Sequence, residues 1–489
     1  MSHVAPLPEH GMSEDEIIAV LRAYRADDVP TTGGRTTAYV YDSGLAGLSE
    51  LGVRAYEVSQ SVNGLDPTAF PSFARIENDL VAAAASLLGG DEKTVGTATS
   101  GGTESCALAV LGARERWRAQ GGEGRARLVV ASSAHPAFRK AAHLFDLEYV
   151  PVPIDASTGC ADVDAMIAAM DARTALVVVS APSYPLGVVD PVEPIAAAAL
   201  ERGILCHLDA CIGGWVLPFI RENESLPPVD LRTPGVTSVS VDIHKYGYSP
   251  KGSSVLLHRD AALRKWHWFS TADWPGYPVV NTTLLSTRAG GPPAVAWAFV
   301  HRIGRDGYRE LALAARRTVL AMAEGINAID GLRVVGSPDA TLIAFTDTAG
   351  DEPPDVLVVA DEMSARGWLI GSQPPHSGLP TTVHVSASAV LEPVVPQFLD
   401  DLRSSVAAAR ALPRATPDAN LVAFAAAIDP ADLTPELIAS ALEGLGLAGG
   451  GELPERMASI NALLGALPAP LTELLLTEVL SGIYTPQRD

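Results

Sequence analysis

A lysine at the end of an apolar run is the first residue of this sequence whose setting could do chemistry. Residues 239–257 read VSVDIHKYGYSPKGSSVLL, so Lys245 lies between His244 and Tyr246, where a predicted buried strand gives way to a turn. We expect desolvation and nearby positive charge to weaken the ammonium form of this lysine. An uncharged amine can form a Schiff base, whereas a lysine on an open surface would be an ordinary solvated charge.

Three other stretches also place polar groups at the ends of apolar runs. In TATSGGTES, a turn at Gly101, Gly102 and Thr103 opens a predicted helix, whose free N–H groups and dipole favour an anion. His135 follows an apolar run in SSAHPAF and could stack on a flat ring, and Asp209 ends the apolar run in ILCHLDACIGGW. Each also has a purely structural interpretation, namely a Gly-Gly turn, a turn histidine or an N-cap aspartate.

Together the four stretches fit one cofactor. An anion cradle, a stacking imidazole, a carboxylate for a ring nitrogen and an amine for an aldehyde match the parts of pyridoxal 5'-phosphate (PLP). A buried carboxylate is costly unless it is paired, and a protonated pyridine nitrogen is a suitable partner for Asp209. The sequence therefore predicts PLP as the cofactor. It predicts no metal site, because the four cysteines show no zinc-ligand spacing.

The elements that must position these groups alternate along the chain. From about residue 94 to 260, short apolar runs alternate with helix-like stretches, which predicts a mostly parallel sheet covered by helices. Functional groups should then gather at the carboxyl ends of the strands. Further helices are predicted at 13–25, 71–90 and from 294 onward, the last with a bend near 304–307.

We expect three parts in the chain. Residues 1–70 form an N-terminal segment, and 71–300 form a large PLP-binding domain. Residues 301–489 form a smaller C-terminal α+β domain, in which the Pro-, Ala- and Gly-rich segment 411–455 is an insertion.

Composition narrows the classes of partner. The net charge of −22 disfavours nucleic acid and anionic membranes, because phosphate groups demand a basic face. The N-terminus lacks the features of a signal peptide, and no window approaches the roughly 18 apolar residues of a membrane helix. We therefore expect a soluble, cytoplasmic protein without a membrane anchor, whose thiols are reduced.

The same motifs closely resemble those of sphingosine-1-phosphate lyases. TSGGTES, the His-Pro-Ala-Phe segment, LDACIGG and DIHKYGYSPKGSS carry the resemblance, and NGLDPTAFPSFARIENDL and TADWPGYPVVNTTLLSTRAGGPP extend it. It covers about residues 35–410 and resumes near 456–485. These lyases belong to the PLP enzymes that include glutamate and aromatic-amino-acid decarboxylases. The resemblance implies the type I, aspartate-aminotransferase-like fold, with a mostly parallel large domain and a smaller α+β domain.

The resemblance also implies roles for the cofactor-binding residues. Lys245 would form the Schiff base with PLP, Asp209 would pair with its ring nitrogen, and His135 would stack on the ring. The active unit would be a homodimer with shared active sites, and the N-terminal segment 1–70 would contribute to the dimer and its active site. The implied phosphate ligands are Gly101, Gly102, Thr103 and His244, with the neighbouring subunit's segment from Ser286 to Gly291, including Gly290.

The implied activity is carbon–carbon cleavage. A retro-aldol reaction would split a phosphorylated, lipid-derived 2-amino alcohol into an aldehyde and an amine such as phosphoethanolamine. Two alternatives stay open, an amino acid α-decarboxylase and a lyase for an unphosphorylated amino alcohol. A third alternative is a protein of this fold that has lost catalysis. The presence of Lys245, Asp209 and His135 argues against it. The candidates for proton transfer are Lys245, Lys251, Tyr41, His244 and Tyr246.

One departure from the family concerns the substrate phosphate. Where this chain has Asp66 the family has a histidine, and where it has Thr68 the family has an aspartate. A carboxylate about 4 Å from a phosphate charge would cost roughly 4 kcal/mol at an effective dielectric constant near 20. Asp66 could instead be paired with a cation, Lys251 or Arg288, or could be a turn residue before a proline. The substrate-binding candidates are Asn63, Asp66, Tyr41, Lys251 and Arg288.

Overall fold

The computed structural model describes residues 7–348, 353–417, 419, 422–423 and 455–486. Its larger sheet consists of β1 (Val95–Thr99), β2 (Arg127–Ala131), β3 (Glu148–Val152), β4 (Thr174–Ser180), β5 (Leu205–Asp209), β6 (Val236–Val241) and β7 (Ser254–His258). These seven strands lie in the order β1-β7-β6-β5-β4-β2-β3. All pairs among β2 to β6 are parallel, and β7 is antiparallel to both of its neighbours. The prediction of a mostly parallel sheet is confirmed.

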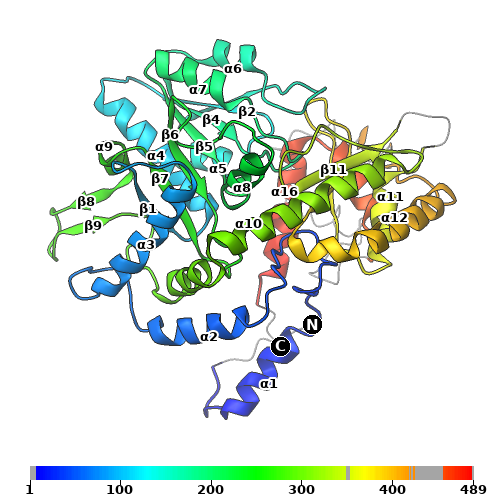
Figure 1. Cartoon of the computed structure of the whole chain (residues 1–489), viewed down its shortest axis with the longest axis horizontal. Helices are drawn as coiled ribbons and strands as arrows, with labels where there is room; N and C mark the ends of the chain where they lie inside the picture. The colour runs from blue at the N-terminus through cyan, green and yellow to red at the C-terminus, as the bar shows by residue number, and fades with distance from the viewer. Residues whose placement is uncertain (1–6, 349–352, 418, 420–421, 424–454, 487–489) are drawn as a thin grey trace.

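Helices cover both faces of this sheet (Figure 1). They are α3 (Pro71–Leu87), α4 (Gly102–Ala119), α5 (Ala137–Leu144), α6 (Val163–Ala169), α7 (Val192–Glu201), α8 (Leu217–Asn223) and α9 (Ala261–Arg264). Successive residues of a strand point to opposite faces, so Leu128 packs in one core cluster and Val129 in another. Because both faces are buried, β4 carries a continuous apolar run, ALVVV, whereas β6 alternates valine with serine and threonine.

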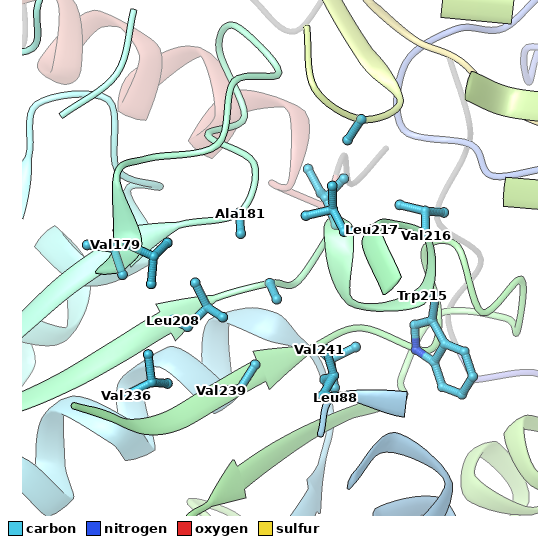
Figure 2. Close-up of a cluster of buried hydrophobic side chains, with 14 of the residues drawn as sticks. Leu88, Val179, Ala181, Leu208, Trp215, Val216, Leu217, Val236, Val239 and Val241 are labelled. Atoms are coloured by element: carbon cyan, nitrogen blue, oxygen red, sulfur yellow. The ribbon is translucent and has the colours of Figure 1, made fainter. Parts of the chain in front are cut away.

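The core on one face fixes the loop that follows β5. Figure 2 shows Val179 of β4, Leu208 of β5 and Val241 of β6 in one cluster with Trp215 and Leu217, which come shortly after β5. All five side chains are nearly inaccessible to solvent. The carboxyl end of β5, where Asp209 lies, is therefore held by a packed core on one face.

The smaller domain is built on an antiparallel sheet. Its strands are β10 (Leu332–Val334), β11 (Leu342–Asp347), β12 (Gly371–Gln373) and β13 (Thr382–Ser386), in the order β10-β11-β13-β12. The remaining helices of this part are η3 (Ala389–Val394), α11 (Val356–Ser364), α12 (Val395–Arg410), α15 (Ala458–Ala466) and α16 (Ala469–Ile483). A separate core cluster joins α11 and α12 to this sheet. The 411–455 segment predicted to be an insertion lies mostly outside the described residues, which include only 411–417, 419, 422–423 and 455 of it.

One long helix connects the two parts. Helix α10 (Gly291–Asn327) packs against α3 and α8 at one end and against β10 and α12 at the other (Figure 1). Its backbone leaves helical geometry at Gly304, where φ is 66° and ψ is 172°, so the predicted bend near 304–307 is confirmed. The predicted domain boundary at residue 300 falls inside this helix.

The N-terminal helix packs little against the rest of the chain, whereas the helix that follows it packs closely on α10. Helix α1 (Glu14–Tyr24), capped by Ser13 and Glu16 as predicted, has no buried residue and stands apart from the body in Figure 1. Helix α2 (Leu48–Ser59) packs on α10, and the hairpin of β8 (Phe269–Thr271) and β9 (Val279–Asn281) projects from the larger domain. None of the described helices combines the length and apolar character needed to cross a membrane.

Gly213→Ala tests the close packing behind β5. In the short helix η1 (Gly213–Trp215), a Cβ at Gly213 would lie far inside van der Waals contact with the carbonyl oxygen of Ala181. We expect a loss of about 1–3 kcal/mol in the free energy of unfolding, measured by urea denaturation. The matched control is Gly371→Ala, whose added Cβ would lie 3.7 Å from the His384 oxygen, an ordinary contact. Equal stability changes in the two variants would contradict this packing argument.

Candidate active site

A cavity of about 330 Å³ opens at the carboxyl ends of β4, β5 and β6, beside the first turn of α4. Parallel strands expose the loops after their carboxyl ends at one edge of a sheet, so residues distant in sequence meet there. The structure brings seven of the predicted site residues to the wall of this cavity. They are Gly101, Gly102, Thr103, His135, Asp209, His244 and Lys245.

The turn before α4 can approach a bound group only because it carries glycines. A Cβ on Gly101 would lie 3.2 Å from His244 Cε1, and one on Gly102 would lie 2.7 Å from Asp242 Oδ2. The first N–H groups of a helix have no partner within the helix, and here they face the cavity. Ser100 stabilises the turn, because its N–H and its Oγ donate hydrogen bonds to Glu104 Oε2 at 2.7 and 2.8 Å. This geometry suits an anion.

Lys245 forms an ion pair that the sequence analysis did not predict. Its Nζ lies 3.0 Å from Oδ2 of Asp242, which directly follows β6 and is almost fully buried. Burial, the largest single influence, lowers the pKa of Lys245, but the negative groups around it, led by the Asp242 carboxylate, together outweigh burial and hold this pKa above its ordinary value. The expectation that desolvation and positive charge would weaken the ammonium form is therefore wrong for the cofactor-free protein. The Asp242 carboxylate, one turn earlier in the chain, is the largest of the contributions that oppose burial.

Asp242 is the centre of this small network. Burial alone would raise its pKa, but Lys245 and His244 together hold it well below the ordinary value. His244 Nε2 lies 3.5 Å from Asp242 Oδ2, while its Nδ1 accepts the N–H of Ser253 at 3.3 Å. Within the described part of the chain, Asp242 Oδ1 is buried and has no hydrogen-bond partner. An orphaned carboxylate oxygen beside Gly102 marks a position that needs a further donor.

Asp209 has one oxygen fixed by the protein and one without a partner. Its Oδ1 accepts the N–H of Cys211 at 3.1 Å and the hydroxyl of Ser240 at 3.3 Å. Strands β5 and β6 place Ser240 opposite Asp209 in register. Among the described residues, Oδ2 has no hydrogen-bond partner, although the side chain lines the cavity and is only 8% exposed. A cationic ring nitrogen would satisfy this second oxygen.

His135 presents a neutral ring to the cavity. Its Nδ1 accepts the N–H of Ala137 at 3.2 Å, and burial lowers its pKa. The ring meets that of Tyr184 edge-on, with centroids 6.5 Å apart and an interplanar angle of 87°. A neutral imidazole held by its own helix and by a neighbouring ring can stack on a flat ligand.

These residues fit PLP. The glycine turn that a Cβ would obstruct suits the phosphate, the unpaired oxygen of Asp209 suits a protonated ring nitrogen, and Lys245 suits the aldehyde. Together with the neutral ring of His135, every part of the cofactor has a counterpart on the cavity wall.

Two predicted catalytic residues lie together, outside the cavity wall. Lys251 Nζ is 4.8 Å from the centre of the Tyr41 ring, and that ring meets the ring of Tyr246 edge-on at 5.0 Å. Burial raises the pKa of Tyr41 to about 12, despite the opposing charge of Lys245. Burial also lowers the pKa of Lys251, and the positive charge of Lys245 lowers it further.

Asp66 lies in a turn and forms no ion pair with either predicted cation. It is exposed, and its Oδ1 accepts the N–H and the hydroxyl of Thr68 at 2.8 and 2.6 Å. The hydroxyl of Thr68, followed by its N–H, lowers the pKa of Asp66. Within the residues that the structure describes, no ion pair links it to Lys251 or Arg288. The structure thus favours the turn interpretation over the paired one.

The other predicted substrate residues of this chain also lie away from the cavity wall. Arg288 pairs with Glu77 at 2.9 Å and donates to the Ala98 carbonyl at 2.9 Å. Asn63 Oδ1 accepts the N–H of Leu65, and its backbone bridges that of Ala289.

The predicted phosphate segment from the neighbouring subunit is fixed at its ends within this chain. Gly290 donates its N–H to the Val62 carbonyl at 2.8 Å, and Leu284 donates its own to Glu104 Oε1 at 3.0 Å. Ser286 between them is exposed. Neither Ser286 nor Gly290 lines the cavity of its own chain, so their role at a neighbour's site stays a prediction.

Sequence reasoning missed several wall residues. Asp242 was given no role although it lies three residues before Lys245, a spacing that brings two side chains together in a helical turn. Tyr184, Cys106 and Cys211 also line the cavity. No motif marks them, because their positions depend on how α4 and the strand ends pack.

Comparisons with known proteins agree with this geometry. A family model described as "Pyridoxal-dependent decarboxylase conserved domain" matches residues 56–346, and one described as "Pyridoxal-dependent enzyme, C-terminal putative HTH domain" matches residues 419–482. Sphingosine-1-phosphate lyase of Oryza sativa subsp. japonica is 35% identical over 83% of this chain and 75% of its own.

Solved structures give the same result. Sphingosine-1-phosphate lyase of Burkholderia pseudomallei is 36% identical, with a TM-score of 0.78 over 86% of this chain and 95% of its own. Glutamate decarboxylase of Lactobacillus brevis, 21% identical, has a TM-score of 0.74 over 84% of this chain and 96% of its own, which bears on the fold alone. The predicted type I fold, with its larger mostly parallel sheet and smaller α+β domain, is confirmed.

A double-mutant cycle measures the Asp242–Lys245 pair. In the cofactor-free protein, Asp242→Ala and Lys245→Met should show a coupling of about 1–3 kcal/mol in the free energy of unfolding. Because the pKa of Asp242 is lowered from 3.8 and that of Lys245 raised from 10.5, the coupling should persist at neutral pH. It should vanish on acidification through the lowered pKa of Asp242 and on alkalinisation through the raised pKa of Lys245.

The matched control for this cycle is another i, i+3 pair. Arg25 and Asp28 lie 3.2 Å apart, with side chains 68% and 56% exposed. Their coupling should not exceed about 0.5 kcal/mol. Additive effects of the Asp242 and Lys245 substitutions, to within the value for this surface pair, would refute the buried ion pair.

Proposed function

The chain belongs to the sphingosine-1-phosphate lyases of the pyridoxal-dependent decarboxylase family and is a PLP-dependent lyase; from this premise we propose how its own residues cleave the substrate. The proposed substrate is a phosphorylated, lipid-derived 2-amino alcohol, split into an aldehyde and an amine such as phosphoethanolamine. The observation that carries the proposal is the convergence of Lys245, Asp209 and a glycine anion cradle on one cavity.

We assign the cofactor contacts as follows. Lys245 attaches the cofactor covalently, Asp209 pairs with the ring nitrogen through its free oxygen, and His135 covers one face of the ring. When bound, PLP would supply an electron sink that weakens a bond at the substrate Cα. The proposed phosphate donors are the turn at Gly101, Gly102 and Thr103 and the side chain of His244.

The contacts of the candidate side chains distinguish which of them can accept the proton of the substrate hydroxyl. His244 has both ring nitrogens engaged, with Ser253 and Asp242. Tyr246 is buried and donates its hydroxyl to the Ala387 carbonyl at 2.8 Å. Tyr41, with a pKa of about 12, keeps its proton at neutral pH. We therefore propose Lys251, whose pKa is lowered, as the base that takes the proton of the β-hydroxyl.

Tyr41 and Lys245 complete the proposed proton transfers. The Tyr41 hydroxyl donates to the oxygen from which Lys251 removes the proton, since the two side chains are in contact. The Lys245 amine, released when the substrate amine takes its place, can return a proton to Cα. Asp242 stabilises the ammonium form of Lys245, and so favours its proton-donating state.

We propose that the active unit is a homodimer. Large apolar side chains are exposed on α1 (Ile17, Ile18 and Leu21) and on the projecting hairpin (Trp274 and Tyr277). Exposed apolar side chains of this kind are typical of protein–protein interfaces, so we expect a second copy of the chain to cover them. The exposed segment that holds Ser286 would then be free to reach the neighbouring site.

One observation supports the alternative of an unphosphorylated substrate. Arg288, which corresponds to a phosphate-binding residue of the family, is already paired with Glu77 in this chain. An amino alcohol with a neutral polar head would not require that cation. The decarboxylase alternative has only family-level support.

The function is tested by product analysis. Wild-type protein should release a long-chain aldehyde from a phosphorylated sphingoid base and no CO₂ from a panel of amino acids. Lys251→Met should keep the visible band of bound PLP yet lose about 10²–10⁴-fold in kcat, because only proton transfer is removed. Lys245→Ala should lose both the band and the activity, and Lys140→Ala, an exposed lysine on α5, should lose neither. Release of CO₂ without aldehyde would establish the decarboxylase alternative instead.

The role of Asp66 is tested separately by substrate preference. Because Asp66 is an exposed turn residue, Asp66→Asn, which keeps the turn and removes the charge, should change the phosphorylated-to-unphosphorylated ratio of kcat/KM by less than about fivefold. Asp66→His is the comparison variant with the family's residue. A gain of more than about tenfold for the phosphorylated substrate in both variants would show that the carboxylate repels the phosphate.

A further inference from the structure

Two cysteines and an aspartate meet at the bottom of the cavity without any motif that joins them in sequence. The thiols of Cys106 and Cys211 and a carboxylate oxygen of Asp209 all lie within 4.8 Å of one another. Cys106 is on the second turn of α4, whereas Asp209 ends β5 and Cys211 follows it. Only the packing of α4 across the carboxyl ends of the strands brings the three together.

All three groups are shielded, and all three line the same cavity. Cys106, Cys211 and Asp209 are 1%, 6% and 8% exposed. Their position on the cavity wall gives an ion a path of entry and leaves one side of the cluster open. Two sulfur ligands and one carboxylate, with an open fourth position, match the three-ligand zinc sites of proteins. Sulfur ligands select thiophilic cations over Mg²⁺ and Ca²⁺.

The surroundings of the thiols are polar rather than those of an ordinary core cysteine. Cys211 Sγ donates to Ser240 Oγ at 3.2 Å, and Cys106 Sγ lies 3.9 Å from the same oxygen. Cys206, by contrast, is fully buried within the apolar cluster on the opposite face of the sheet. Cys106 and Cys211 thus share a polar partner at a cavity, whereas Cys206 only fills space in the core.

The local charge also favours a cation. A Cβ on Gly102 would touch both oxygens of Asp242 and the sulfur of Cys211 at 2.7–2.8 Å, so this second carboxylate lies beside the cluster. The nearby ammonium of Lys245 is neutralised by its ion pair with Asp242. The carboxylate of Asp209 and any thiolate then add negative charge that only the incoming ion offsets.

We propose that Cys106, Cys211 and Asp209 bind one thiophilic divalent cation, such as Zn²⁺ or Cd²⁺, in the cofactor-free protein, and that this cation and PLP exclude each other. The exclusion rests on the proposed function, in which Asp209 pairs with the ring nitrogen, because Oδ1 is already held by Cys211 and Ser240 and only Oδ2 is free for either ligand. The cation site itself does not depend on that role.

The experiment is a titration of the reduced, cofactor-free protein with Cd²⁺. The ultraviolet charge-transfer band of a cadmium–thiolate bond reports ligation by sulfur, and calorimetry gives the stoichiometry. We expect one ion per chain. Cys106→Ala and Cys211→Ala should each weaken binding by at least about tenfold, as should Asp209→Asn, which leaves both thiols in place. Circular dichroism and retained PLP binding check that the cysteine variants are folded.

Cys160→Ala is the matched control. Cys160 is a half-buried free thiol in a loop and belongs neither to the cluster nor to the cavity wall, so its removal should leave Cd²⁺ binding unchanged. Binding that survives in Cys106→Ala and Cys211→Ala, or that is lost in Cys160→Ala, would overturn the site.

Protein loaded with PLP separates the two parts of the proposal. It should bind Cd²⁺ at least about tenfold more weakly than the cofactor-free protein. Equal binding would overturn mutual exclusion and the placement of Asp209 at the ring nitrogen. A protein that takes up no PLP would refute the proposed function, while the titration of the cofactor-free form would still decide the cation site.

Discussion

Buried carboxylates must be paired, and this constraint organises the whole site. Strands β5 and β6 end side by side, so Asp209 and Asp242 both reach a place from which water is largely excluded. Asp242 finds its partner three residues later in Lys245, at 3.0 Å. Asp209 keeps one oxygen without a partner among the described residues, which is the reason the cavity suits a cationic ring. The ion pair of Asp242 with Lys245 and the unpaired oxygen of Asp209 thus define where the aldehyde and the ring nitrogen of the cofactor belong.

The turn that carries Lys245 is held from outside the larger domain. Tyr246 donates its hydroxyl to the carbonyl of Ala387 beside the smaller sheet, and Tyr308 of α10 donates to that of Gly247 at 3.0 Å. The lysine is therefore fixed by its own strand end, by the connecting helix and by the smaller domain at once. A displacement of the smaller domain would be transmitted to the lysine through these two hydrogen bonds, which ties the geometry of the site to the domain arrangement.

Much of this could be predicted from sequence. Apolar runs that alternate with helices determine a mostly parallel sheet, and the sheet edge then gathers Gly101, His135, Asp209 and Lys245. The antiparallel direction of β7 was not predicted, because the connection of residues 242–253 is long enough for either direction. The pairing of Arg288 with Glu77, 211 residues apart, and the meeting of Cys106 with Cys211 could not be predicted, because only tertiary packing creates them. The prediction for the charge state of Lys245 was wrong because it considered the adjacent His244 and Tyr246 and left out Asp242, three residues earlier.

The covalent position of the cofactor is the central claim, and chemical trapping tests it most directly. The PLP-loaded protein is reduced with borohydride, digested and mapped by peptide mass spectrometry. Our account predicts the phosphopyridoxyl group on the peptide that contains Lys245, at close to one group per chain. Asp209→Asn should reduce the yield of trapped cofactor but not move it. A label on Lys251, or on any lysine other than Lys245, would contradict the account.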